Sequence, residues 1–169
     1  RVGDVYQGGK VAYILVNGDP GYDATTQHGL IAATSDQSRS IDWDRLTGEF
    51  PLYQGTNRGA IGTAIGTGFS NTNTIIASQG TNYAAGVARA YTGGGYTDWY
   101  LPSKDELNKL YLNRVAIGGF ISNSNGLYWS SSEIQSYPYH SAWLQDFSNG
   151  GPLSIFKDFD VNVRAIRSF

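Results

Sequence analysis

The stretch that decides the fold reads Asp98-Trp99-Tyr100-Leu101-Pro102-Ser103-Lys104-Asp105-Glu106-Leu107. Ser103 and Glu106 have the spacing of a capping box, in which each side chain accepts a hydrogen bond from the other residue's main-chain N–H group. Pro102 fixes the entry to the helix that such a box begins. Apolar residues then recur at helical spacing, namely Leu107, Leu110 and Tyr111. We therefore predict a core strand around Trp99 that leads into a helix ending near residue 114.

On the N-terminal side of this stretch, the sequence predicts three short strands. Residues 5–16 read as two strands joined by a turn at Gly8-Gly9, because paired glycines accept the positive φ angles of hairpin turns. Residues 17–21 turn the chain, and residues 28–33 form a third strand. Residues 35–58 are polar and irregular apart from Ile41 and Trp43, which predicts a surface loop.

The remaining sequence predicts two more helices and a set of hairpins. Residues 71–91 carry apolar side chains at near-helical spacing with a break at Gln79-Gly80, so we expect two short helices. Residues 128–131, 141–147 and 153–156 read as strands, with a hairpin turn at 148–151, and residues 161–166 close the chain as one strand. Helices in the middle and antiparallel hairpins at both ends indicate an α+β domain in which the terminal strands can pair.

Composition limits the possible functions. The 169 residues fit one domain, and no apolar stretch approaches the 18 or so residues that a membrane span needs. The chain has no cysteine, which excludes disulfides, thiolate metal sites and a cysteine nucleophile. A formal net charge of −2 argues against a dedicated nucleic-acid binder.

Neither catalysis nor a metal site is expected from the reactive residues. The two histidines, His28 and His140, are separated in the sequence, and Asp146 is the acid that could orient either. Residues 158–162 offer three oxygen side chains at alternating spacing, which falls short of the six to eight oxygen ligands that calcium takes. We therefore predict a protein that is not an enzyme.

Five motifs carry a resemblance to a known family. They are His28-Gly29-Leu30-Ile31-Ala32, Ala64-Ile65-Gly66-Thr67-Gly68, Gly94-Gly95-Tyr96-Thr97 with the opening stretch, Tyr128-Trp129-Ser130-Ser131-Ser132-Glu133 and Val163-Arg164-Ala165-Ile166-Arg167-Ser168-Phe169. In sequence and order they resemble the DUF1566 family over nearly the whole chain. That family is similar to the C-terminal domain of a bacterial collagen-like adhesin.

The resemblance implies a C-type-lectin-like α+β fold for residues 1–169, taken as a single C-terminal ligand-binding domain. It also implies an upstream signal and collagen-like stalk, a homotrimer, and an extracellular place on the bacterial surface or in secreted form. The implied function is non-enzymatic adhesion through sulfated glycosaminoglycans of host cells. The proline-centred triplets and the Trp-Asn-Asp run of calcium-dependent lectins are not found, so no cofactor is expected.

Seven cationic residues are the candidates for contacts to sulfate groups. Three flank the apolar face of the capped helix, three lie on the polar loop and one lies near the last hairpin. They are Lys104, Lys109, Arg114, Arg39, Arg45, Arg58 and Lys157. Three copies of such a patch raise local charge and effective concentration together. The alternative is that these side chains only form a solvated face, whereas Arg164 and Arg167 in the closing strand are expected to make structural ion pairs.

A second interpretation is a display domain that offers its loops to a protein partner or to copies of itself. Tyr137, Tyr139, Asn123 and Asn125 suit such a surface, because tyrosine and asparagine provide adaptable contacts in binding loops. Trp129 is expected in the core, and its alternative role is to stack on a sugar.

Overall fold

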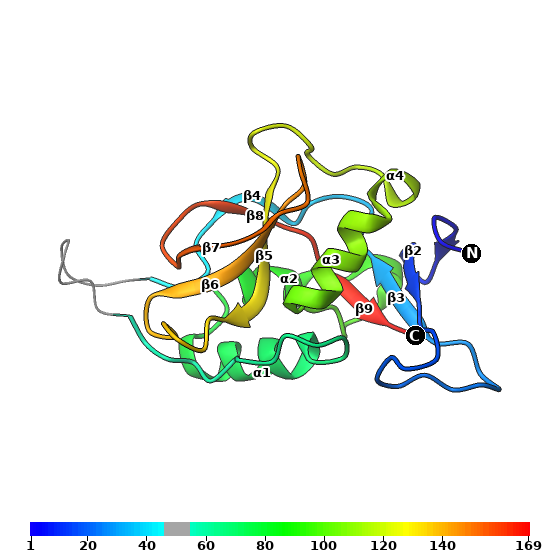
Figure 1. Cartoon of the computed structure of the whole chain (residues 1–169), viewed down its shortest axis with the longest axis horizontal. Coiled ribbons are helices and arrows are strands. Elements are labelled where there is room, and N and C mark those ends of the chain that lie inside the picture. Colours follow the sequence, from blue (N-terminus) through cyan, green and yellow to red (C-terminus); the bar gives the residue numbers. More distant parts are fainter. Residues whose placement is uncertain (46–54) are drawn as a thin grey trace.

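The computed structural model describes residues 1–45 and 55–169, which form two sheets with short helices packed between and beneath them (Figure 1). The elements are β1 (Val5–Tyr6), β2 (Gly9–Ile14), β3 (Gly29–Ala32), β4 (Ser38–Ile41), α1 (Gly68–Gln79), α2 (Ala84–Ala90), the 3-10 turn η1 (Gly93–Gly95), α3 (Lys104–Leu112), α4 (Arg114–Ile117), β5 (Leu127–Glu133), β6 (Ser141–Asp146), β7 (Pro152–Phe156), β8 (Val161–Val163) and β9 (Ile166–Ser168). These elements confirm the predicted α+β class. Among the described residues, none of the helices is both long and apolar enough to cross a bilayer.

The two sheets are joined by the closing segment of the chain. The first sheet has the strand order β1-β2-β3-β9 and the second β4-β8-β5-β6-β7. Pairing is antiparallel except between β5 and β8, which run parallel. In Figure 1 both chain ends lie beside the first sheet, and α3 packs against strands of both sheets.

The prediction of one closing strand was wrong. The strand is interrupted at Arg164 and Ala165, and the residues on either side of the interruption belong to different sheets. β8 pairs with β4 and β5, whereas β9 pairs with β3 and so brings the C-terminal residues to the N-terminal sheet. The buried Arg164 side chain fixes the break: its Nη2 lies 2.6 Å from Asp36 Oδ1 and 2.6 Å from Gly119 O. This ion pair confirms the structural role predicted for Arg164.

The N-terminal hairpin turns one residue earlier than predicted. Its two turn residues are Gln7 and Gly8, with φ angles of 46° and 85°, and Gly9 already pairs with Tyr6 in the sheet. Two-residue hairpin turns of this type need positive φ at both positions. A side chain on Gly8 would also collide with the main chain of Gly93, so Gly8 is the glycine that this turn requires.

The predicted surface loop at 35–58 is partly wrong, because residues 38–44 belong to the folded body. β4 pairs with β8, and Trp43 is 1% exposed. The Trp43 indole donates a hydrogen bond to Ser130 O at 2.7 Å, which satisfies its one polar group inside the core. Residues 46–54 of that prediction lie outside the described part of the chain.

Two apolar clusters form the core and contain the aromatic motifs. Trp99 and Trp129 lie in the first, together with Trp43, and Tyr100 and Tyr128 lie in the second beneath α3. Trp129 is fully buried and its indole donates to Ile41 O at 2.9 Å. The core position predicted for Trp99 and Trp129 is therefore confirmed, and Trp129 is not a sugar-stacking residue.

The predicted capping box begins α3, which ends at Leu112 and is followed by the short α4. Ser103 Oγ accepts from Glu106 N at 3.3 Å, and Glu106 Oε2 accepts from Ser103 N at 2.7 Å. Glu106 Oε1 also accepts from Gly66 N at 2.9 Å and from the Tyr100 hydroxyl at 3.3 Å. Burial of this carboxyl raises the pKa of Glu106 above its ordinary value of 4.5, although these hydrogen bonds oppose the change.

The raised pKa of Glu106 predicts how its contribution to stability depends on pH. A carboxyl whose pKa is higher in the folded than in the unfolded chain contributes fully below its unfolded pKa, and this contribution is lost as pH rises through the folded pKa. The free energy of unfolding of the wild type, minus that of Glu106→Gln, should therefore fall as pH rises from 4 to 7. Urea denaturation at several pH values measures this difference; a rise over the same range would contradict the prediction.

Candidate functional site

Three predicted cations lie along α3 and α4, each over an aromatic ring. Lys104 Nζ is 4.1 Å from the centre of the Trp143 ring, and Lys109 Nζ is 4.5 Å from that of Tyr13. The Arg114 guanidinium is 4.0 Å from the ring of Tyr111. All three side chains are partly exposed. Because their ring partners belong to β6, β2 and α3, the cations line a surface and do not meet in one pocket.

Arg39 and Arg45 are exposed, although Arg39 lies in β4 and not in the predicted loop. The Arg39 side chain is 78% exposed, and its Nε is 3.9 Å from Asp36 Oδ2. The same Asp36 is already held by the buried Arg164. Arg39 also borders a cavity of about 380 Å³ with Asn125.

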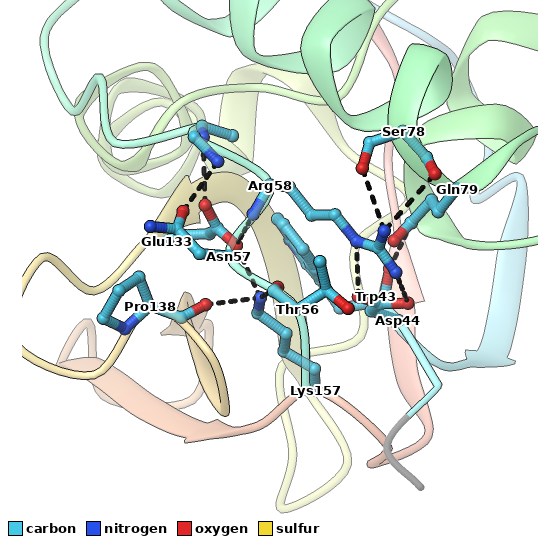
Figure 2. A network of polar contacts seen from close by, with 12 residues as sticks. Trp43, Asp44, Thr56, Asn57, Arg58, Ser78, Gln79, Glu133, Pro138 and Lys157 are labelled. Carbon is cyan, nitrogen blue, oxygen red and sulfur yellow. Dashed lines mark hydrogen bonds and ion pairs between the residues drawn. The ribbon is translucent and has the colours of Figure 1, made fainter. Parts of the chain in front are cut away.

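The structure corrects the prediction for Lys157, which is fully buried and cannot reach a glycan. Its Nζ donates to Glu133 Oε1 at 2.5 Å, to Pro138 O at 2.7 Å and to Thr56 O at 2.9 Å (Figure 2). An ammonium has three N–H groups, so these contacts use all of them. Burial lowers the pKa of Lys157, while the hydrogen bond and the charge of Glu133 act against this change.

The prediction for Arg58 is corrected for the same reason. Its guanidinium forms two parallel hydrogen bonds with Asp44, Nε to Oδ2 at 2.8 Å and Nη2 to Oδ1 at 3.0 Å. Nη1 donates to Ser78 Oγ at 2.9 Å, and only 13% of the side chain is exposed. Such a two-point contact has fixed geometry and commits the arginine to the fold.

Glu133 connects these two ion pairs into one network (Figure 2). Besides Lys157, its Oε1 accepts from Arg58 N at 2.8 Å, and its Oε2 accepts from Ala60 N at 3.0 Å. The network therefore fixes residues 56–60 against the end of β5 and the residue that follows β7. Residues 56–60 and the end of β5 each continue directly into a wall of a surface cavity.

This cavity, which we call the Trp143 pocket, has a volume of about 510 Å³. One wall is the segment after Ala60, another is the loop that follows Glu133, and β6 and the first residue of α3 provide the rest. Its lining includes Trp143, Lys104, Gln135, Ser136, Thr63 and Ile61. An aromatic ring, an ammonium, an amide and two hydroxyls therefore share one opening.

The sequence did not single out Trp143. In β6 the core side chains are Ala142 and Leu144, so alternation places Trp143 on the opposite face, where it is half-buried. A tryptophan on the outward face of an alternating strand was the available signal.

The other reactive residues serve the fold. His28 Nδ1 is 3.1 Å from the main-chain oxygen of Phe169 and so connects the start of β3 to the C-terminal residue. Asn162, in the acidic run at 158–162, turns inward and donates to Asn125 O and Leu127 O, both at 2.7 Å. Within the described ranges, no group of three or more histidine, aspartate or glutamate side chains is placed to hold a metal ion.

A comparison with protein families identifies the chain. The family model described as the Lcl C-terminal domain matches residues 32–167. The chain belongs to the Lcl C-terminal domain family. This confirms the family resemblance of the motifs and makes the protein a member of an adhesin-related family, which suggests a surface or secreted protein. A comparison with curated proteins found no match.

The matched range includes all seven predicted cations and the Trp143 pocket. It excludes the hairpin of β1 and β2, and with it Tyr13, the ring beneath Lys109. The part of the site that belongs to the shared Lcl C-terminal domain is therefore the surface of α3 and β6, together with the loops beside them.

Proposed function

We propose that this domain is a non-enzymatic adhesin module that binds sulfated glycosaminoglycans through surface lysines and arginines, as a homotrimer. The observation that carries the proposal is the division of the cations into two groups. Lys157, Arg58 and Arg164 are each paired with an acid inside the protein. A second group remains at the surface, namely Lys104, Lys109, Arg114, Arg39 and Arg45.

A spread of exposed cations suits a long, flexible polyanion. Each exposed ion pair contributes on the order of 0–1 kcal/mol, so one site binds weakly. A glycosaminoglycan chain crosses several such sites, and copies of the domain in one assembly make the later contacts intramolecular. Multivalence thus allows a chain with a net charge of −2 to retain a strongly acidic ligand.

The proposal predicts a strong dependence on salt and on three side chains. We expect the triple substitution K104Q, K109Q and R114Q to weaken binding to immobilised heparin about tenfold or more at 0.1 M salt. By analogy with nucleic-acid phosphates, each lost contact lowers the slope of log affinity against log salt by about 0.7–0.9. Surface plasmon resonance at several salt concentrations measures both quantities.

Two controls separate this effect from a general change of charge or stability. Arg1→Gln also removes one exposed positive charge, but at the far N-terminus, and should leave the affinity within about twofold of the wild type, a few tenths of a kcal/mol. Desulfated heparin tests the sulfate groups. Retention on heparin that persists unchanged in molar salt would refute the mechanism, and light scattering tests the trimer separately.

A protein-binding or self-associating display domain is the second candidate. It is favoured by the loop after β5, where Tyr137 is 67% and Tyr139 is 54% exposed. Exposed tyrosines are frequent anchors of protein interfaces. Binding that resists salt but is lost in Tyr137→Ser and Tyr139→Ser would support this candidate over the first.

A further inference from the structure

We infer that the Trp143 pocket binds one pyranose unit that carries an anionic substituent, either a carboxylate or a sulfate ester. The inference rests on the proposed function, because it assigns the pocket one unit of the glycan chain. It goes beyond that function because it assigns binding of one sugar unit to a defined pocket, in addition to the dispersed cations of α3 and α4. The inference depends on one observation: Trp143 and Lys104 are in contact and both line a cavity of about 510 Å³.

The chemistry of the pocket matches the two kinds of surface on a sugar ring. A pyranose presents C–H groups on its faces and hydroxyls around its edge. Trp143 offers an apolar ring for the former, while Gln135, Ser136 and Thr63 offer hydrogen-bonding groups for the latter. A pocket with few polar groups around an aromatic surface is typical of sites that orient a small ligand.

The charge of the pocket favours an anionic sugar. Lys104 supplies the ammonium, and as the first residue of α3 it lies at the helix end that carries positive partial charge. Glu133 also borders the cavity, but Lys157 lies 2.5 Å from Oε1 of this carboxylate and compensates its charge. The contact of Lys104 with the Trp143 ring is weak enough for an anion to draw the ammonium to itself, which frees the ring for the sugar.

The main-chain segments that form the walls of the pocket are fixed before a ligand arrives, and of the polar groups described above only the Lys104 ammonium has to move. The hydrogen bonds of Glu133 hold residues 58–60 on one side, and the contact of Lys157 with Pro138 holds the loop on the other. Lys104 N donates to Ser132 Oγ at 3.0 Å, which ties the start of α3 to β5. A preformed site loses less conformational entropy on binding than a site made of free side chains.

Tryptophan fluorescence can report on this pocket alone. The chain has four tryptophans, and Trp43, Trp99 and Trp129 are each at most 1% exposed. Trp143 is therefore the one that acrylamide quenches readily. We expect a sulfated heparin disaccharide at saturation to reduce the quenching constant of the wild-type protein at least twofold, whereas maltose, a neutral disaccharide, leaves it unchanged.

Substitutions test the same site by affinity. Trp143→Ala should weaken binding of the sulfated disaccharide about tenfold or more, and Trp143→Phe should restore most of the loss because it keeps an aromatic face. Lys104→Gln should weaken binding about fivefold or more. Lys109→Gln is the matched control, since Lys109 also covers a ring but lies outside the pocket, and it should change disaccharide affinity less than twofold.

The outcomes separate this inference from the proposed function. Unchanged quenching with the sulfated disaccharide, or equal protection by maltose, would overturn the inference even if Trp143→Ala failed to fold. Heparin binding that depends on Lys109 and Arg114 but not on Trp143 would overturn the inference and leave the proposed function intact. If the wild type does not bind heparin in low salt, the proposed function fails first. A uronate disaccharide without sulfate distinguishes the two anionic groups.

Discussion

Lys157→Met is expected to lower the free energy of unfolding by about 3–5 kcal/mol, the usual cost of removing one partner of a buried ion pair. The substitution leaves Glu133 as a buried carboxylate without its cation, and the carbonyls of Thr56 and Pro138 lose their donor. Methionine fills much of the volume of the lysine stem, so packing loss is small. The cost therefore arises from the electrostatics of the network in Figure 2.

Urea denaturation monitored by circular dichroism measures this effect, and Lys109→Met is the matched control. Both lysines lie over an aromatic ring, Lys157 at 4.6 Å from Trp43 and Lys109 at 4.5 Å from Tyr13, but only Lys157 is fully buried. Lys109→Met should therefore cost less than about 0.5–1 kcal/mol. Adding Glu133→Gln to Lys157→Met should recover part of the loss, since it removes the unpaired charge. A Lys157→Met protein as stable as Lys109→Met would refute the account.

Arg164→Met is expected to destabilise the fold by a similar amount, about 3–5 kcal/mol. The guanidinium holds Asp36, whose side chain is 2% exposed, and also donates to Ala33 O and Gly119 O at 2.9 and 2.6 Å. Without this guanidinium, the buried Asp36 carboxylate is left with the exposed Arg39 at 3.9 Å as its cation, and the carbonyls of Ala33 and Gly119 lose a donor. The link that these contacts make between β3, the segment before β4 and the loop after α4 is lost as well.

Arg39→Met provides the control for this prediction, because Arg39 lies 3.9 Å from the same Asp36 but on the exposed side. It should change stability by less than about 0.5 kcal/mol. Arg164→Lys should fall between the two, since one ammonium cannot reproduce the planar set of donors. Thermal and urea denaturation of the three variants give the order directly; equal stability of the Arg39 and Arg164 variants would contradict the assignment.

The sequence predicted those elements whose signals are local. The capping box of Ser103 and Glu106 depends on residues three apart, and the structure confirms it together with α3. The hairpin of β6 and β7 follows from alternation and a glycine-containing turn. The split of the closing strand was missed because it depends on Asp36, which is 128 residues away from Arg164 along the chain.

The candidate site was predicted in part, for a related physical reason. The sequence reveals the charge of a lysine or arginine in a polar stretch, but not whether its side chain is buried. Arg58 finds Asp44, 14 residues earlier, and Lys157 finds Glu133, 24 residues earlier, so both leave the surface. Lys104 was placed correctly at the surface, but Trp143, its ring partner 39 positions later, is brought to it only by the packing of α3 on β6.

The crossing of the closing segment from one sheet to the other also bears on the order of events during synthesis. β8 is an inner strand of the second sheet and β9 the edge of the first, yet both follow every other strand in the chain. Neither sheet can be completed until residues 161–168 have been made. A growing chain therefore reaches nearly its full described length while both of its sheets still lack a strand.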